Sequence, residues 1–254
     1  MKTAVLIVAA GRGNRAPGDI PKQYRRLGND MVLSKTIRCF TAYGSFGPVM
    51  VAINPADKPM FDEAVRYAAQ DILWTAGGES RTESVANGLK ALGEYNPDQV
   101  LIHDGARPYL TGNVIDSVLK GLKTHKAVVP TLPIVDALKT PEGLPVDRDK
   151  IMRVQTPQGF SFNEIALLYG ALDKTASFAD DIEVAKSGGL EIAFCDGDER
   201  NTKLTYEYDF QNAAQKLPQL TNTASITQSR GSRGGTSLSA RGAKKDFTSR
   251  RASV

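Results

Sequence analysis

Apolar runs alternate with amphipathic segments along the chain. The first run, Ala4 to Ala10, is uninterrupted and rich in β-branched residues, which is typical of a parallel strand buried on both faces. Shorter apolar runs predict further strands at 49–53, 72–75, 100–102, 127–129 and 190–194. The intervening segments predict helices at 32–43, 58–69, 82–92, 113–123, 163–174 and 181–187, with a last helix ending near 216.

This alternation predicts an α/β fold, a Rossmann-like and mostly parallel sheet with helices on both faces. The stretch from Leu138 to Val154 breaks the rhythm, because it is polar and carries two prolines and a glycine. We expect it to form a protruding β-arm over about 137–154. Ligands of such sheets bind outside the carboxyl ends of the strands. The loops that begin at Gly11, Gly77 and Asp104 all leave strands at that edge.

The loop after the first run is rich in glycine and is followed by cations. Gly11 and Gly13 would let backbone N–H groups approach an anion, and Arg15 and Lys22 follow them. Ala16 stands where a dinucleotide fingerprint needs its third glycine, and no Gly-Lys pair of a P-loop is present. An ordinary strand-to-helix turn is the alternative, but such a turn does not require the Pro-Lys-Gln-Tyr block that follows.

The last part of the chain differs in composition. From Pro218 onward, seven Lys or Arg residues against one Asp give this segment a charge of +6, so the rest of the +4 chain carries −2. Its few large apolar residues cannot bury enough surface to offset the entropy lost on ordering. We predict one domain over 1–217 and a disordered basic tail over 218–254.

The cysteine pattern and the length of the apolar runs indicate the compartment. Cys39 and Cys195 lie far apart, with no Cys/His cluster, which favours a reducing compartment and argues against a zinc site. No apolar run approaches the roughly 20 residues of a transmembrane helix. We expect a cytoplasmic protein that does not bind membranes.

Several blocks of the sequence resemble one enzyme family, the 2-C-methyl-D-erythritol 4-phosphate cytidylyltransferases. They occur in the family order and cover roughly residues 3 to 216. The blocks are AAGRGNR, PKQY, GGESRTESV, IHDGARP, VDR, TPQGF and NTKLT. The residues of several blocks resemble those of the bifunctional members of the family, whose second domain is a cyclodiphosphate synthase. The metal-ligand pair of that second domain does not appear in this sequence.

The resemblance implies an activity. The enzyme would transfer CMP from CTP to 2-C-methyl-D-erythritol 4-phosphate, releasing pyrophosphate, in the non-mevalonate route to isoprenoid precursors. The nucleophile would be a phosphate monoester, which is largely dianionic near neutral pH and needs no general base. Cations and a magnesium ion would supply the stabilisation of charge.

The resemblance also implies roles for individual residues. The cations on the phosphates and the substrate would be Arg15, Lys22, Arg148 and Lys203. The nucleotide-binding residues would be Ala9, Ala10, Gly11, Gly13, Gly77, Gly78, Glu79, Arg81 and Ser84. The substrate-binding residues would be Asp104, Arg107, Asp136 and Thr156, with Asp104 also the magnesium ligand. Arg148 would reach the site of a partner subunit, so we expect a homodimer through the arm.

Three other functions stay open. A ribitol-5-phosphate cytidylyltransferase would share the fold and loops, and a guanylyltransferase of the molybdenum-cofactor type would share the opening loop but need a purine site. A protein that binds nucleic acid through its basic tail is the alternative from another class. Phe247 is the single aromatic residue of the tail, so we do not expect nucleic acid as a partner. Deletion of 218–254 is expected to leave cytidylyltransfer intact.

Overall fold

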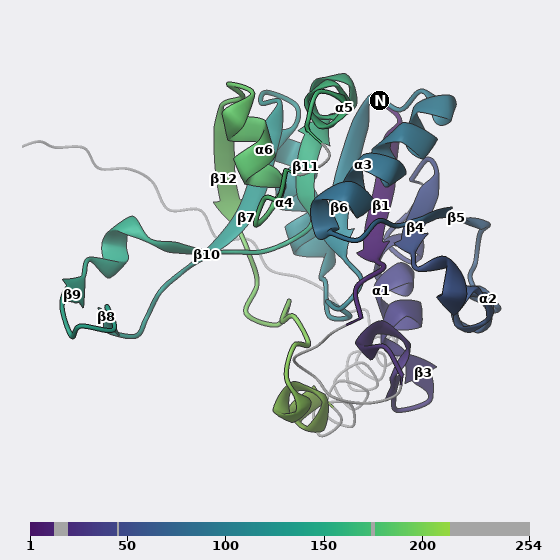
Figure 1. Cartoon of the computed structure of the whole chain (residues 1–254), viewed down its shortest axis with the longest axis horizontal. Helices are drawn as coiled ribbons and strands as arrows, with labels where there is room; N and C mark the ends of the chain where they lie inside the picture. Colours follow the sequence, from purple (N-terminus) through teal and green to yellow (C-terminus); the bar gives the residue numbers. More distant parts are fainter. Residues whose placement is uncertain (13–19, 45, 174–175, 214–254) are drawn as a thin grey trace, which may run out of the picture. The chain divides into compact units, whose positions relative to one another are not determined.

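The computed structural model describes residues 1–12, 20–44, 46–173 and 176–213 (Figure 1). The chain divides into two units, and all described residues belong to the first, Met1–Ala214. The disordered tail and the domain end predicted from the sequence lie outside these residues.

An eight-stranded sheet forms the centre of the described unit, with strand order β10-β7-β11-β6-β1-β4-β5 and β12 paired with β7. Its strands are β1 (Thr3–Ala9), β4 (Val49–Ile53), β5 (Ile72–Ala76), β6 (Gln99–Asp104), β7 (Ala127–Pro133), β10 (Met152–Val154), β11 (Gln158–Ser161) and β12 (Ile192–Asp196). The pairs β1–β4, β1–β6, β4–β5 and β7–β12 are parallel, whereas β10 and β11 run antiparallel to their neighbours. The mostly parallel sheet predicted from the sequence is confirmed.

Helices cover both faces of this sheet (Figure 1). They are α1 (Val32–Thr41), α2 (Lys58–Val65), α3 (Arg81–Leu92), α4 (Gly112–Gly121), α5 (Phe162–Gly170) and α6 (Asp181–Ser187). Short 3₁₀ turns lie at η1 (Lys22–Tyr24), η2 (Pro55–Asp57), η3 (Gly93–Tyr95) and η4 (Arg148–Lys150), and a two-stranded ribbon joins β2 (Arg26–Leu27) to β3 (Asp30–Met31). Residues 207–213 are helical as well.

The alternation of side chains along β1 separates two apolar layers. Val5 and Ile7 face a core shared with α1, α2 and α4, whereas Ala4 and Leu6 face a core shared with α3, α5 and α6. Val5, Ile7, Ala4 and Leu6 are all fully buried. The uninterrupted apolar run follows from this position, because a central strand covered on both faces has no side that meets water.

β11 is a strand that the sequence analysis did not predict. It lies between β6 and β7 and runs antiparallel to both. A Cβ at Gly159 would lie 2.5 Å from Val118 Cγ1 and 2.9 Å from Leu122 Cδ1, so the glycine allows α4 to pack closely against the sheet. The run is only four residues long and holds one large apolar residue, Phe160. Its pattern therefore gives little β signal.

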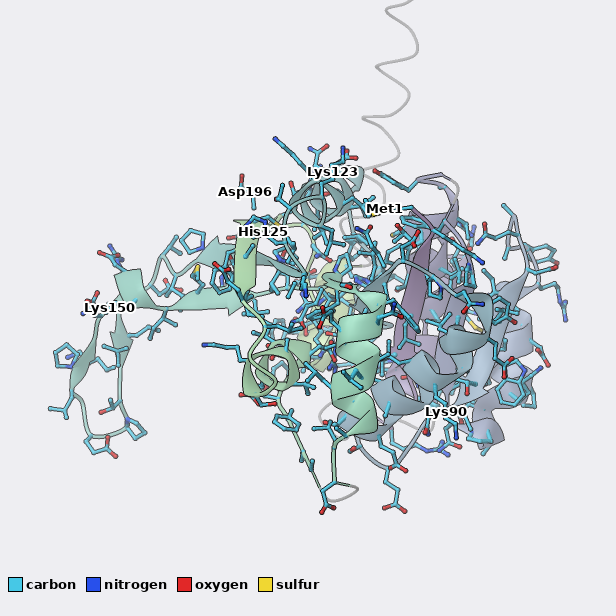
Figure 2. The ribbon with its side chains drawn as sticks, turned by 90° about the horizontal axis from the view of Figure 1, so that it is seen from above. Met1, Lys90, Lys123, His125, Lys150 and Asp196 are labelled. Atoms are coloured by element: carbon cyan, nitrogen blue, oxygen red, sulfur yellow. The ribbon has the colours of Figure 1, made fainter. Side chains whose placement is uncertain are left out.

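The protruding β-arm is confirmed. The chain leaves the sheet after Pro133 and rejoins it at Met152, which pairs with Pro133. Between them, β8 (Leu138–Lys139) and β9 (Pro145–Val146) form a small antiparallel ribbon, closed by a turn with Gly143 at φ +85°. Both views show this segment standing away from the sheet, and Figure 2 labels Lys150 on it (Figures 1 and 2).

Candidate active site

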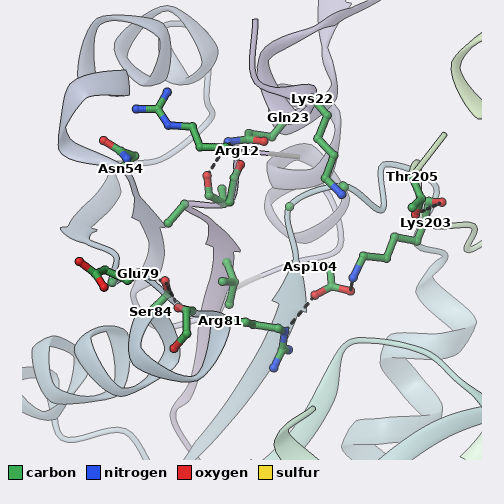
Figure 3. Close-up of a pocket in the computed structure, with 18 residues that line it drawn as sticks. Arg12, Lys22, Gln23, Asn54, Glu79, Arg81, Ser84, Asp104, Lys203 and Thr205 are labelled. Atoms are coloured by element: carbon green, nitrogen blue, oxygen red, sulfur yellow. Dashed lines mark hydrogen bonds and ion pairs between the residues drawn. The ribbon is translucent and has the colours of Figure 1, made fainter. Parts of the chain in front are cut away.

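A pocket of about 630 Å³ opens at the carboxyl ends of β1, β4, β5 and β6 (Figure 3). Several residues predicted from the sequence line it together. They are Ala9, Ala10, Gly11, Lys22, Gly78, Glu79, Arg81, Ser84, Asp104 and Lys203. The edge of the sheet that the sequence indicated therefore carries the pocket.

Other predicted residues lie elsewhere. Gly77 packs against Ala10 and donates its N–H to the Ile53 carbonyl, at 2.7 Å. Asp136 and Arg148 belong to the arm and do not line this pocket, and Arg148 Nη1 donates to the Val135 carbonyl at 2.6 Å. Gly13 and Arg15 lie outside the described residues.

The first loop is held from within by Gln23. The Gln23 side chain is buried and its Nε2 donates to the carbonyls of Ala9, at 2.7 Å, and Gly11, at 3.2 Å. The amide therefore fixes the backbone of the loop at the point where β1 ends. Gln23 belongs to the Pro-Lys-Gln-Tyr block, in which the family resemblance implied a role only for the neighbouring Lys22; Lys22 points into the pocket (Figure 3).

Arg12, Asn54 and Thr205 also line the pocket and were not predicted. Arg12 Nη1 pairs with the buried carboxylate of Asp57, at 3.0 Å. The Gly-rich loop is therefore connected to η2 as well as to η1. No local pattern in the sequence indicates this pair, because its members lie 45 positions apart.

The second glycine loop leads into the N-terminus of α3. Ser80 caps the helix by accepting from the Glu83 N–H, at 3.0 Å, and the Gly78 N–H donates to Ser84 Oγ, also at 3.0 Å. The Glu79 N–H donates to the Glu83 carboxylate at 2.8 Å. This is a capping arrangement that fixes the turn, and it leaves Glu79 and Ser84 on the pocket wall.

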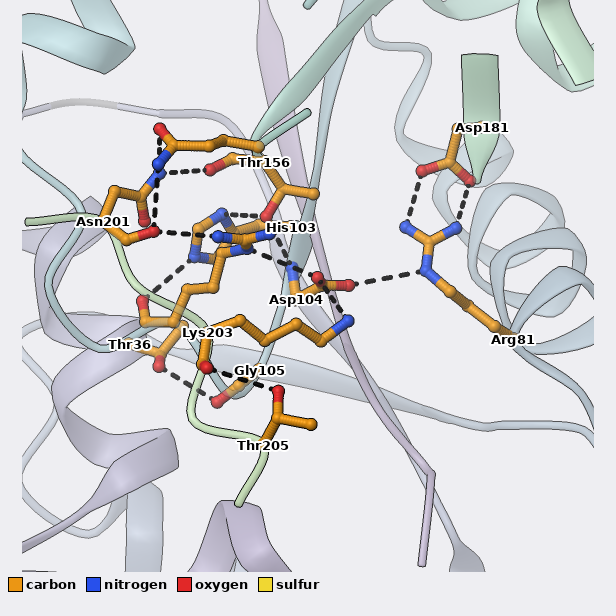
Figure 4. A network of polar contacts seen from close by, with 12 residues as sticks. Thr36, Arg81, His103, Asp104, Gly105, Thr156, Asp181, Asn201, Lys203 and Thr205 are labelled. Atoms are coloured by element: carbon orange, nitrogen blue, oxygen red, sulfur yellow. Dashed lines mark hydrogen bonds and ion pairs between the residues drawn. The ribbon is translucent and has the colours of Figure 1, made fainter. Parts of the chain in front are cut away.

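Asp104 ends β6 and is surrounded by cations (Figure 4). Lys203 Nζ lies 2.9 Å from Oδ2, and the Nε atoms of Arg81 and Arg107 lie 3.4 Å from Oδ1 and Oδ2. Burial alone would raise the pKa of Asp104, but the charges of Lys203, Arg81 and Arg107 outweigh it and hold the pKa well below its ordinary value. Asp104 is therefore ionised throughout the physiological range.

A buried polar network lies behind Asp104. Thr156 Oγ1 accepts from the Asp104 N–H at 3.1 Å and lies 3.0 Å from His103 Nδ1. His103 Nε2 lies 3.2 Å from the Arg107 carbonyl, which can only accept, so Nε2 carries the proton and Nδ1 accepts from Thr156. The hydroxyl of Thr156, predicted to bind substrate, thus has two protein partners.

His103 is fully buried and neutral. Burial lowers the pKa of His103 to about 4, against the opposing charge of Asp104. A neutral ring suits its contacts, since one nitrogen must donate and the other must accept. His103 and Thr156 therefore support the backbone of Asp104 without adding charge to the site.

Asn201 connects this network to the Lys203 segment. The side-chain Nδ2 of Asn201 donates to the backbone carbonyl of Thr156 at 2.8 Å. The backbone carbonyl of Asn201 accepts from Arg107 Nη1, also at 2.8 Å. The Leu204 N–H donates to the Ala106 carbonyl at 2.9 Å. These contacts bring Lys203 to Asp104 from a segment about one hundred residues away in the sequence.

Two negative findings apply to the described part of the chain. No group of three or more His, Cys, Asp or Glu side chains there is placed to hold a metal ion by itself. None of the helices described is long and apolar enough to cross a membrane.

The sheet, the Gly-rich loop at the end of β1 and the cations around a strand-end carboxylate define an α/β protein of the nucleotidyltransferase type. The family model for 2-C-methyl-D-erythritol 4-phosphate cytidylyltransferase matches residues 3–219. The chain therefore belongs to the 2-C-methyl-D-erythritol 4-phosphate cytidylyltransferase family, and the resemblance seen in the sequence is confirmed.

Individual relatives support the assignment of the chain to this family. A 2-C-methyl-D-erythritol 4-phosphate cytidylyltransferase of Cereibacter sphaeroides is 40% identical over 221 residues, which are 85% of this chain and 97% of the relative. A bifunctional IspD/IspF enzyme of Paramagnetospirillum magneticum is 41% identical over 84% of this chain. The crystal structure of the Thermus thermophilus cytidylyltransferase matches with a TM-score of 0.69 and 28% identity, over 86% of this chain and all of that one.

The bifunctional relatives are longer than the matched region. The chain spans 56% of the Paramagnetospirillum magneticum protein and 60% of the one from Maricaulis maris.

Proposed function

We propose that this protein transfers CMP from CTP to 2-C-methyl-D-erythritol 4-phosphate, giving CDP-methylerythritol and pyrophosphate for isoprenoid precursor synthesis. The observation that carries the proposal is the meeting of Gly11, Lys22, Asp104 and Lys203 in one pocket of a chain from this family. We also propose a cytoplasmic location, in keeping with two free cysteines.

In this reaction, a phosphate oxygen of the alditol phosphate attacks the α-phosphorus of CTP. A new P–O bond forms while the bond from the α-phosphorus to the bridging oxygen breaks, and pyrophosphate leaves with that electron pair. Both reactants are polyanions, so bringing them together and stabilising the spread of charge is the main task. Lys22 and Lys203, which both point into the pocket, would serve this task (Figure 3).

The backbone and small residues of the pocket suit the nucleotide. The backbone near Gly11 lies at the end of β1, where N–H groups would hold a triphosphate, and Gly78, Glu79 and Ser84 form a polar wall. A pyrimidine would fit such a wall through hydrogen bonds at its edge, whereas a purine would need more room.

A magnesium ion belongs to the proposal. Mg²⁺ in nucleotide sites is commonly held by one or two carboxylates together with phosphate oxygens and water. Asp104 offers one ionised carboxylate on the pocket wall, which it already shares with Lys203, Arg81 and Arg107, so it would contribute an oxygen to an ion held mainly by the nucleotide phosphates. When bound, the ion would neutralise charge on the phosphates.

A homodimer through the arm is part of the same proposal. Arg148 does not line the pocket of its own chain, and the arm segment exposes apolar side chains at Val135, Leu144 and Ile151. Exposed apolar side chains on a projecting segment suit contact with another protein surface. Sedimentation equilibrium of the wild-type chain is expected to give a dimer, and a monomer at micromolar concentration would contradict this.

The test of the activity is pyrophosphate release with CTP, Mg²⁺ and 2-C-methylerythritol 4-phosphate, run beside ribitol 5-phosphate and with ATP in place of CTP. We expect release with CTP and the methylerythritol phosphate alone, and phosphorus NMR should show the new diphosphate. Release with ribitol 5-phosphate alone would assign a different substrate, and no release with either would overturn the proposal.

A matched pair of lysine variants makes the test specific to the pocket. Lys203→Met removes one of the three cations around Asp104 and is expected to lower kcat/KM by roughly a hundredfold or more, in line with loss of a charge that acts in the transition state. Lys186→Met changes an exposed lysine on α6 and should leave the rate unchanged.

A further inference from the structure

Asp181 is a fully buried carboxylate that the sequence analysis did not single out. It is the first residue of α6 and has an exposed fraction of 0%. Arg81 Nη1 and Nη2 donate to its Oδ1 and Oδ2 at 2.8 and 2.7 Å, and the hydroxyl of Tyr169 donates to Oδ1 at 2.6 Å. A carboxylate with this burial is stable as an ion only when it is paired and hydrogen-bonded. These three residues come from α3, α5 and α6.

Arg81 lies between two carboxylates (Figure 4). Both of its terminal nitrogens face Asp181, and its Nε lies 3.4 Å from Oδ1 of Asp104. Burial alone would lower the pKa of Arg81, but the neighbouring carboxylates, Asp181 above all, raise it, so the guanidinium stays charged. Two of its three nitrogens are thus directed away from the space where a nucleotide would lie.

The planar shape of the guanidinium makes this arrangement specific. Its donors point in fixed directions, so when the two Nη atoms form a fork on Asp181, the direction of Nε is determined as well. That direction leads to the carboxylate of Asp104, which Lys203 reaches from the other side (Figure 4). Asp181 therefore influences Asp104 without touching it.

We infer that Asp181 is a positioning residue for the reaction proposed above, because it orients Arg81 so that Nε donates to the carboxylate of Asp104. Arg81 therefore binds Asp104 and does not bind the phosphates of the nucleotide. The expected effect of Asp181 on the rate of pyrophosphate release rests on the proposed function. The orientation of Arg81 can be measured without that activity. This orientation changes the role expected of Arg81, which the family resemblance assigned to nucleotide binding.

The chain offers a control for simple packing. Tyr169→Phe removes one hydrogen bond to Asp181 and keeps the fork to Arg81, whereas Asp181→Asn keeps the shape and removes the charge. Both variants are expected to unfold at lower temperature. Only Asp181→Asn is expected to lower kcat, by roughly tenfold or more, with the KM for CTP changed less than about threefold. Tyr169→Phe should keep both constants within about twofold of wild type.

A double-mutant cycle tests whether Asp181 acts through Arg81. Arg81→Lys keeps the charge but cannot span both carboxylates, so it is expected to show a loss similar to that of Asp181→Asn. The double variant should then be no slower than either single variant. Losses that multiply in the double variant would overturn the inference, as would equal losses of kcat in Tyr169→Phe and Asp181→Asn.

The orientation of Arg81 is measured by nitrogen-15 NMR of the arginine side chains in the full chain. The Nε–H signal of Arg81, identified by its absence in Arg81→Lys, should be protected from solvent exchange in wild type and in Tyr169→Phe, and should be lost to exchange in Asp181→Asn. An unchanged signal in Asp181→Asn would overturn the inference. If the wild type released no pyrophosphate while the signal behaved as expected, the proposed function would fail and the positioning of Arg81 would stand.

Discussion

At the scale of single residues, the pocket depends on side chains that support reactive groups from behind. Gln23 holds two carbonyls of the first loop, and His103 and Thr156 hold the backbone of Asp104. None of these contacts joins residues closer than twelve positions in the sequence. The geometry of the site therefore depends on tertiary structure as much as on its motifs.

Gln23→Met is the first prediction at this scale. The variant keeps a side chain of similar length and removes the amide that donates to Ala9 and Gly11. Leaving these carbonyls without their donor is expected to lower the free energy of unfolding by about 1–3 kcal/mol. The KM for CTP should rise by roughly fivefold to tenfold, because the loop loses its anchor.

Denaturant unfolding and steady-state kinetics measure the two effects. Gln211→Met changes an exposed glutamine in the helical segment 207–213 and serves as the control. Wild-type stability in Gln23→Met would show that the amide contacts contribute little.

The second prediction concerns the buried histidine and pH. The pKa of His103 is about 4 in the folded chain, below its ordinary value of 6.5, so between these values the unfolded chain binds the extra proton. Stability is therefore lost as the pH falls from about 6.5 towards 4. Between pH 7 and pH 5 this loss amounts to about 2 kcal/mol.

His103→Gln isolates the contribution of the histidine, because glutamine can still donate to the Arg107 carbonyl but does not titrate. Other acidic groups affect both chains alike, so the difference between them is the measured quantity. Urea unfolding at pH 7, 6 and 5 should show a shallower loss of stability in His103→Gln. Parallel curves would contradict a depressed pKa in the folded state.

At the scale of elements, most of the sheet and its helices could be predicted from periodicity. The apolar runs of β1 and β4 are buried on both faces, and the helical stripes of α1 and α4 face one core. These signals are local, because the spacing of apolar residues within each segment shows which of its side chains are buried. The fold class was predictable for this reason.

Neither strand β11 nor the buried residues that hold the pocket side chains in place could be predicted from local patterns. The position of β11 between β6 and β7 depends on the space left by Gly159, and the pairing of Arg81 with Asp181 joins residues one hundred positions apart. Sequence motifs marked the glycine loops and Asp104, whose chemistry is local. They carried no information on which buried partner would hold each group.

A glycine substitution tests the close packing of β11. Gly159→Ala places a methyl group within 3 Å of Val118 and Leu122 and is expected to cost about 1–3 kcal/mol of stability, as overpacking of a core does. Gly170→Ala, at the end of α5, meets no atom within 4 Å and should be neutral or slightly stabilising. Thermal unfolding compares the two, and equal melting temperatures would contradict the tight contact.

At the scale of the whole molecule, the proposed dimer makes each site depend on two chains. Arg148→Ala and Lys203→Ala are each expected to be nearly inactive alone. In a refolded equal mixture, half of the dimers would hold one chain of each kind, and one of their two sites would have both Lys203 and an intact arm.

The mixture should therefore recover about one quarter of wild-type activity. Pyrophosphate release measures the recovery, with each variant refolded alone as the control. No recovery in a mixture shown to contain mixed dimers would mean that Arg148 does not serve the partner's site.

The pairing of Met152 with Pro133 has a consequence for how this family can vary. The arm leaves the sheet at Pro133 and rejoins it at Met152, which are paired neighbours. The 18 intervening positions, 134–151, therefore form a loop whose length does not affect the path of the strands. The arm can therefore be exchanged as a module. In the proposed dimer, a chimaera carrying the arm of a relative would keep its own sheet and pocket and acquire the partner preference of the donor.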